Sequence, residues 1–262
     1  MEGWRYYKHS LLPTTSMYKE LDLTFLEDFW KDKEYKNVWF IRYCTDFGTD
    51  KDTGWWQCIK DEPFDFSQVK SKRRTRIRKG TSFCDVHRIS PFEYARELAE
   101  ITLQECQKYE KAIKSSSTQE ELIYSYKKKY DEDKIHWWGI FEKDTHELCG
   151  YGQYFIYEDY VNQVQVKVLS KYLGLEANAA LVYEILSFYL TERGGNKKYI
   201  TNGERNLVHK TNYPQYLIDT FGFRKVNSRL HIIYRPWVGY VISVLFPFRN
   251  LIGKIKGGAL AS

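Results

Sequence analysis

The amino-acid sequence predicts an α/β protein built on a mixed β-sheet. From residue 83 onward, hydrophobic patterns with periods of 2 and 3.6 residues follow one another as a strand, two helices, three strands, a helix, a strand, a helix and a strand. Three consecutive strands joined by short turns form a meander. Helices before and after it favour a mixed sheet over a doubly wound parallel one. A hydrophobic content of 43% in 262 residues is enough for one large domain with an added lobe.

A strand hairpin and a basic helix are expected before this core. Val38–Thr45 and Trp55–Lys60 are rich in aromatic and β-branched residues, as strands are. The segment Ser67–Lys79 is predicted to be a helix that ends at Gly80, because glycine commonly closes helices. We therefore treat residues 1–82 as an N-terminal extension.

The elements of the core follow in order. Phe83–Ile89 has a strand pattern, and a helix with an apolar stripe comes after it. A second helix is expected to begin at Ser117 or Thr118, with two glutamates after it as in a capping box. The three strands of the meander are His136–Glu142, Leu148–Tyr157 and Val161–Leu169.

The second half of the core contains the most apolar helix. Ala177–Leu190 is apolar almost all round, which is typical of a buried helix. The remaining elements are a strand at Lys197–Thr201, a helix at His209–Phe221 and a strand at Arg224–Tyr234. The predicted core therefore spans residues 83–236, and residues 237–262 form an apolar and basic tail.

The net charge of +6 comes from one segment. Seven Lys and Arg residues and no acid lie between Phe66 and Gly80, so the positive charge is local. On a helix, Lys72, Arg76 and Lys79 share one face. That face suits an anionic partner, such as a phosphorylated donor, a tRNA acceptor stem or an anionic lipid head group. The alternative is a solvated face that keeps the protein soluble.

Neither a metal site nor a disulfide framework is expected. The five cysteines are widely spaced and form no Cys-x-x-Cys pair, and the histidines show no metal-ligand spacing. No apolar signal segment opens the sequence, so we expect a cytoplasmic protein.

The stretch 237–246 is apolar, and Arg249, Lys254 and Lys256 follow it. About ten residues are too few to cross a bilayer, which takes about 20. Two interpretations remain. The stretch is either a terminal helix packed on the domain or a helix that lies on a membrane surface, which would make the protein membrane-peripheral.

The densest group of polar residues follows the strand expected at 197–201. It contains Asn202, Glu204, Arg205 and His209. A carboxylate and an imidazole are suitable general bases, so Glu204 and His209 are candidate catalytic residues. Asn202 and Arg205 are candidates for binding a substrate. The alternative is an ordinary loop, since Asn-Gly is a turn dipeptide.

The order of elements over residues 83–236 resembles that of the GNAT acyltransferase superfamily. The basic stretch SKRRTRIRK, at 71–79, is similar to one that FemAB-type members of the same fold carry. Residues 201–236 resemble the end of uncharacterised bacterial proteins of this group. The resemblance implies a GNAT-like acyl-CoA N-acyltransferase fold with an N-terminal extension.

The resemblance also implies where a cofactor binds. In the superfamily, a Gln/Arg-x-x-Gly-x-Gly/Ala turn and the helix after it hold the cofactor pyrophosphate. The matching stretch here is KYLGLE, at 171–176. Lys171 and Gly174 fit the pattern. Glu176 departs from it, because a carboxylate repels a pyrophosphate.

A second family motif runs from an asparagine to a Gly-Phe pair across the next helix, here from Asn212 to residues 222–223. By this resemblance, Asn212 and Tyr216 lie on the cofactor side. Ile218 stands where the family has the tyrosine that serves as general acid. Tyr216 and Tyr213, on the same helix, are the available substitutes.

On this resemblance we expect an N-acyltransferase. It would move an acyl group from an acyl-CoA-type thioester to the amine of a small molecule, either an amino sugar or an amino-acid-like acceptor. One alternative is a FemAB-type transferase that uses aminoacyl-tRNA, bound through the basic helix 67–79. Another is a non-catalytic GNAT-like protein that binds a partner or an anionic membrane surface through this helix and the C-terminal tail.

Overall fold

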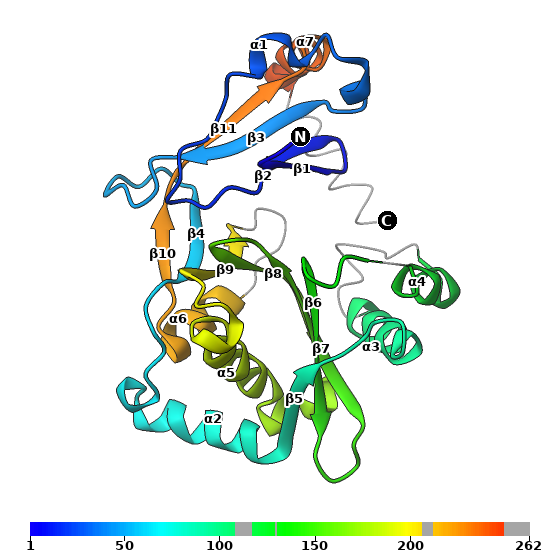
Figure 1. The fold of residues 1–262 in the computed structure, drawn as a ribbon, viewed down its shortest axis with the longest axis vertical. Coiled ribbons are helices and arrows are strands. Elements are labelled where there is room, and N and C mark those ends of the chain that lie inside the picture. Colours follow the sequence, from blue (N-terminus) through cyan, green and yellow to red (C-terminus); the bar gives the residue numbers. More distant parts are fainter. Residues whose placement is uncertain (108–116, 129, 206–211, 249–262) are drawn as a thin grey trace. The chain divides into compact units, whose positions relative to one another are not determined.

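The computed structural model describes residues 1–107, 117–128, 130–205 and 212–248 (Figure 1). The chain divides into two compact units. The smaller unit contains Met1–Trp55 and the chain from Asn227 onward, and the larger unit contains Trp56–Val226. The division at 82/83 and 236/237 stays a prediction about functional parts. The strand that begins at Trp56 and the basic helix lie in the larger unit with the strands after residue 83.

The larger unit is built on a seven-stranded mixed sheet with the strand order β10-β4-β9-β8-β7-β6-β5. The strands β6, β7 and β8 form the expected antiparallel meander, and β5 pairs antiparallel with β6. On the other side, β8 pairs with β9 in parallel, and β9 pairs antiparallel with β4. This arrangement confirms the mixed sheet. The strands are β4 (Trp56–Lys60), β5 (Cys84–Arg88), β6 (Ile135–Glu142), β7 (Leu148–Ile156), β8 (Tyr160–Val168), β9 (Tyr199–Glu204) and β10 (Arg224–Asn227).

Helices cover both faces of this sheet. The helices are α2 (Ser71–Phe83), α3 (Ala95–Gln107), α4 (Gln119–Tyr126), α5 (Ala177–Tyr189) and α6 (Tyr213–Phe221). Successive residues of a strand point to opposite faces. Trp138 of β6 accordingly belongs to the core formed with α2, α5 and α6, whereas Trp137 belongs to the core formed with α3 and α4.

Two helices match their sequence signals closely. The apolar helix α5 is largely buried, as its composition predicts. Thr118 caps α4 with the expected capping box. Its hydroxyl accepts from the N–H of Glu121 at 3.2 Å, and the Glu121 carboxylate accepts from the Thr118 N–H at 2.9 Å.

The basic helix differs from its prediction at both ends. It begins at Ser71 because Asp65 accepts a hydrogen bond from the N–H of Ser67 and caps a separate 3-10 helix, Phe66–Gln68. It continues through Gly80 to Phe83. A Cβ on Gly80 would lie 2.5 Å from the carbonyl oxygen of Glu176, so glycine serves the close approach of α2 to α5 and not a helix end.

The smaller unit has a four-stranded sheet with the order β1-β2-β3-β11. Its strands are β1 (Trp4–Tyr7), β2 (Ser10–Pro13), β3 (Phe40–Thr45) and β11 (Arg229–Tyr234), and its helices are α1 (Leu26–Phe29) and α7 (Pro236–Leu245). The two strands expected as a hairpin before residue 82 lie in different sheets, because β3 pairs with β11 and β4 pairs with β9.

The sequence predicts one continuous last strand, and this prediction is wrong. Arg224–Tyr234 divides into β10 and β11, which belong to different sheets. Ser228 is fully buried at the break. Its N–H donates to the carbonyl of Trp55 at 3.1 Å, and its carbonyl accepts from the Thr53 hydroxyl at 2.6 Å. These bonds take the place of ladder pairing and let the chain change sheets.

Gly80→Ala is expected to destabilise the protein. A methyl group would press on the backbone of Glu176, and overpacking of this kind costs about 1–3 kcal/mol. Thermal or urea unfolding measures the change. Gly239→Ala in α7 is the matched control, because a Cβ there meets the Tyr234 side chain at an ordinary 3.6 Å. A Gly80→Ala protein as stable as the control would contradict the close contact.

Candidate functional site

The strands β8 and β9 pair over three residues and then part. The paired residues are Tyr160 with Tyr199, Val161 with Ile200, and Asn162 with Thr201. The strand β8 continues to Val168, and β9 continues to Glu204 beside β4. In the described part of the chain, the edge of β8 beyond Asn162 therefore has no strand partner on this side, which leaves backbone N–H and C=O groups for other partners.

A β-bulge lies where the strands part. Tyr154 of β7 faces Gln163 of β8, whereas Gln153 faces Gln165, so Val164 is an extra residue on β8. Bulges bend a strand and re-aim its groups, and they are common beside active sites. The open edge of β8 is thus bent at the opening.

The predicted polar cluster lies partly within a strand. Asn202, Gly203 and Glu204 belong to β9, because the pairing with β4 continues as far as Gln57 opposite Glu204. Gly203 has a φ of +88°, a conformation that favours glycine. Glu204 is half-buried, and Arg205 is exposed. His209 lies outside the described residues and stays a prediction.

The helix α6 places a phenol at the opening. Tyr213 lies within hydrogen-bonding reach of Gln163, the first residue of β8 past the paired stretch. Burial raises the pKa of Tyr213, and Gln163 opposes this in part. Asn212 precedes Tyr213, is exposed, and makes no side-chain cap bond. The phenol of Tyr213 is therefore protonated at neutral pH and serves as a donor.

A second tyrosine, Tyr154, lies close to Tyr213 in the core of the larger unit. Tyr154 is fully buried, and its hydroxyl has no hydrogen-bond partner in the described part of the chain. Burial raises its pKa well above the usual value, and Tyr213 and Tyr189 lie close enough to raise it further. Buried polar groups are usually bonded, so this hydroxyl is available to a bound molecule or water. Sequence reasoning missed Tyr154 and Gln163, and neither carries a signal of its own, since β8 also contains Asn162, Gln165 and Lys167.

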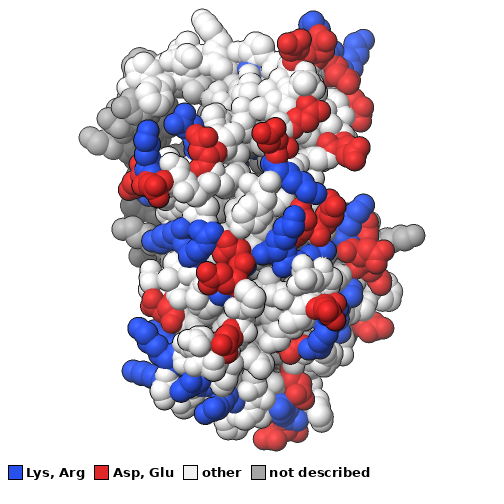
Figure 2. Space-filling model, turned by 60° about the vertical axis from the view of Figure 1, so that its left-hand side comes forward, with Lys and Arg blue, Asp and Glu red and all other residues white. Residues whose placement is uncertain are grey.

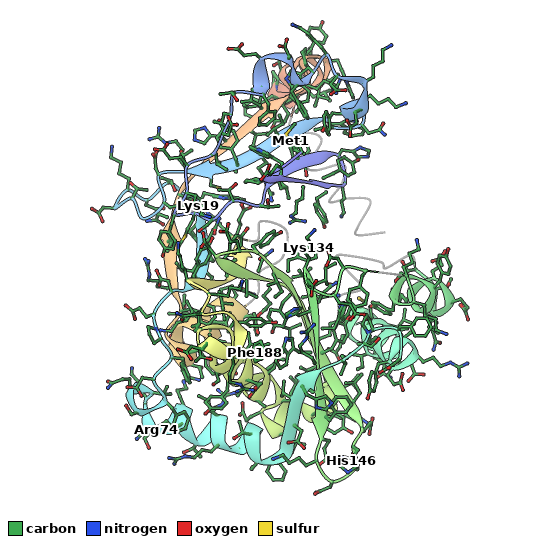
Figure 3. The ribbon with its side chains drawn as sticks, in the orientation of Figure 1. Met1, Lys19, Arg74, Lys134, His146 and Phe188 are labelled. Atoms are coloured by element: carbon green, nitrogen blue, oxygen red, sulfur yellow. The ribbon has the colours of Figure 1, made fainter. Side chains whose placement is uncertain are left out.

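A half-buried histidine, His136 of β6, pairs across the sheet with Tyr154 of β7. The indole N–H of Trp138 donates to the Tyr189 hydroxyl at 3.0 Å. A second hydrogen bond, of 2.5 Å, joins the Tyr189 hydroxyl and Nδ1 of His136. Burial, together with the charge of Arg88, lowers the pKa of His136 to about 4. Trp138 also packs against Phe188, labelled in Figure 3, with 5.2 Å between ring centroids.

Lys171, which is expected to contact a cofactor, is paired with a carboxylate. Lys171 donates to Glu147 at 2.7 Å, and the Tyr172 hydroxyl donates to the other oxygen of Glu147. Lys171 and Gly174 lie in the 3-10 helix Ser170–Leu175 that follows β8, and the space beside Gly174 is open.

The helix α2 packs against the first turn of α5. Glu176, just before it, accepts a hydrogen bond from Nε of Arg76 at 2.7 Å. Ala177 is 0% exposed, and Gly80 brings α2 into contact with this turn. The Glu176 carboxylate lies next to this turn in the chain, and its negative charge disfavours an anion there.

The cations of α2 differ in accessibility. Arg76 is turned to Glu176 and lies over the ring of Tyr216, with 5.9 Å to the ring centroid. Arg73 pairs with Asp219 of α6 at 3.8 Å. Lys72 and Lys79 are exposed. On the predicted cationic face, Arg76 is thus paired with a carboxylate from a distant part of the sequence, and its role in binding a substrate stays a prediction.

The expected site residues thus form two groups in the described structure. Asn202, Glu204 and the start of α6 lie by the opening of β8 and β9. Arg76 and Tyr216 lie together with Glu176 at the covered end of α5. Among the described residues, no cluster of His, Cys, Asp and Glu is arranged to hold a metal ion.

No protein-family model matches this sequence, and no curated protein matches it. Among solved structures, FemX is similar over 92% of this chain and 85% of its own, with a TM-score of 0.59 and 10% identity. A protein of unknown function from Bacteroides thetaiotaomicron is similar over 85% of this chain and 79% of its own, with a TM-score of 0.51 and 13% identity.

The C-terminal domain of a putative lysylphosphatidylglycerol synthetase from Agrobacterium fabrum is similar over 92% of this chain and 84% of its own, with a TM-score of 0.50 and 8% identity. At such identities these are likenesses of fold. With the mixed sheet and its parting strands, they confirm the expected GNAT-like fold.

His136 is expected to make stability depend on pH. Its pKa is about 4 in the folded protein and about 6.5 in an unfolded chain, so the unfolded state binds more protons between these values. The free energy of unfolding therefore falls as the pH is lowered from 6.5 to 4. His136→Gln should reduce this fall in urea unfolding at a series of pH values.

His146→Gln, at the exposed tip of the β6–β7 turn labelled in Figure 3, is the matched control and should keep the wild-type dependence. Equal pH dependence in the wild type and His136→Gln would contradict a buried neutral His136.

Proposed function

We propose that this protein transfers an acyl or aminoacyl group to an amine where β8 and β9 part. The observation that carries the proposal is the open, bulged edge of β8 beyond Asn162. Backbone N–H groups on such an edge are fixed donors for the carbonyl oxygen of an acyl donor. They stabilise the negative charge that develops there when the amine attacks.

Two side chains suit the proton transfers. Glu204, half-buried at the end of β9, would accept the proton of the acceptor ammonium, with His209 as the second candidate base. Tyr213, whose pKa is raised by burial, would give a proton to the leaving group. Tyr213 would thus serve as the general acid, a role that Ile218 cannot fill because its side chain has no proton to give. Asn202 and Arg205 would bind the acceptor, a small amine of the amino-sugar or amino-acid class.

For the carrier of the group, the geometry favours aminoacyl-tRNA over acyl-CoA. A coenzyme A pyrophosphate bound in the superfamily's way would need the first turn of α5, which α2 and Glu176 cover. Lys72 and Lys79 stay exposed on α2 and suit a phosphate backbone. Figure 2 shows Lys and Arg side chains gathered at its lower end, with some carboxylates between them.

Glu204→Gln and Tyr213→Phe are each expected to slow transfer. Loss of a general base or acid typically costs about 10²- to 10⁴-fold in rate. Single-turnover transfer from radiolabelled aminoacyl-tRNA to a panel of amines measures the change. Glu120→Gln, on exposed α4, is the control and should keep the wild-type rate. If both variants were as fast as the control, the assigned roles would be wrong.

Binding of tRNA is expected to depend steeply on salt. Each lost phosphate contact lowers the slope of log K against log salt by about 1, so Lys72→Ala with Lys79→Ala should lower it by about 2. Filter binding at several salt concentrations measures the slope. The control is Lys127→Ala with Lys128→Ala, which removes two exposed lysines beyond α4. Absence of tRNA binding at low salt, together with transfer from acyl-CoA, would exclude the proposed carrier.

A further inference from the structure

The helix α7 (Pro236–Leu245) presents an apolar face to solvent. The exposed residues recur three and four positions apart and so share one side of the helix. They are 42% to 73% exposed, whereas Val238, in the first turn, is buried. We call this set the α7 stripe: Trp237, Tyr240, Val241, Val244 and Leu245.

Further aromatic residues extend the α7 stripe at both ends. Trp39, itself 40% exposed, meets Trp237 edge to face, with 5.8 Å between ring centroids. Phe246 follows the helix and is 58% exposed. A contiguous apolar surface of this kind is uncommon on a soluble protein and marks a place of interaction. Figure 2 shows a broad area of uncharged side chains at its upper left.

The part of the sequence that contains α7 and follows it is positively charged. Asp219 is the last acidic residue, and residues 220–262 contain seven Lys and Arg side chains and no Asp or Glu. Three of these cations, Arg249, Lys254 and Lys256, follow α7 directly in the sequence. Apolar and aromatic residues combined with cations are complementary to an anionic lipid surface, where Trp and Tyr rings sit at head-group level.

We propose that α7 lies flat on an anionic phospholipid bilayer through the α7 stripe. No helix among the described residues is long and apolar enough to cross a membrane. At 1.5 Å per residue, α7 spans about 15 Å of a hydrocarbon core about 30 Å thick. Contact between two copies would bring like charges together. The lipid surface is therefore the occupant that fits both the apolar and the cationic parts.

Flotation with vesicles tests this proposal. The full chain is expected to float with vesicles of phosphatidylcholine and phosphatidylglycerol. With phosphatidylcholine alone, flotation should be at least about tenfold weaker, and salt should reduce it with the anionic vesicles. Tyr240→Ser combined with Val244→Ser should weaken flotation at least about tenfold, since each change removes apolar burial.

Both substituted side chains are exposed, so circular dichroism should show an unchanged fold. Tyr124→Ser on α4, where Tyr124 is 68% exposed, is the matched control and should float like the wild type. Several results would overturn the proposal. These are no flotation with either vesicle, equal flotation of the α7 stripe variant, or light scattering that shows a dimer which this variant dissociates. The last result would assign the α7 stripe to a second copy of the chain.

Discussion

The contact between α2 and the first turn of α5 is the constraint on which the larger unit depends most. Gly80 lets the two helix backbones approach, and the Arg76–Glu176 pair at 2.7 Å closes the end of α5. Arg73 ties the same helix to Asp219 of α6. Because Ile77 of α2 is in the core with α5 and α6, the three helices form one packed layer over the sheet. The same contact places a paired carboxylate next to the N-terminus of α5, where it disfavours an anion.

The superfamily resemblance implies one site made of an opening between two strands and a pyrophosphate-binding turn. The contact between α2 and α5 affects the turn and not the opening. The opening between β8 and β9 contains the Val164 bulge, Gln163 and Tyr213, on which the proposed transfer rests. At the turn that the resemblance assigns to a pyrophosphate, Glu176 pairs with Arg76. The proposed function therefore combines chemistry at the opening with a different way of holding the carrier, for which the exposed lysines of α2 are candidates.

Elements governed by local patterns could be predicted from the sequence. The meander, the buried helix α5 and the capping box at Thr118 all follow from periodicity or from neighbouring residues. The break at Ser228 could not be predicted, because β10 and β11 together have one continuous strand pattern. The hydrogen bonds that make the break, to Trp55 and Thr53, come from far along the chain. Sequence reasoning identified Glu176 as an obstacle to a pyrophosphate. Its partner Arg76, 100 residues away, required the structure.

The most direct test of the account is calorimetric titration of acetyl-CoA into the wild type and Glu176→Gly. Glu176 has a φ of +60°, so glycine suits its backbone while removing the carboxylate. The account predicts no binding to the wild type and measurable binding to Glu176→Gly, whose helix end is then open to an anion. Tight binding of acetyl-CoA to the wild type, unchanged or weakened in Glu176→Gly, would contradict it.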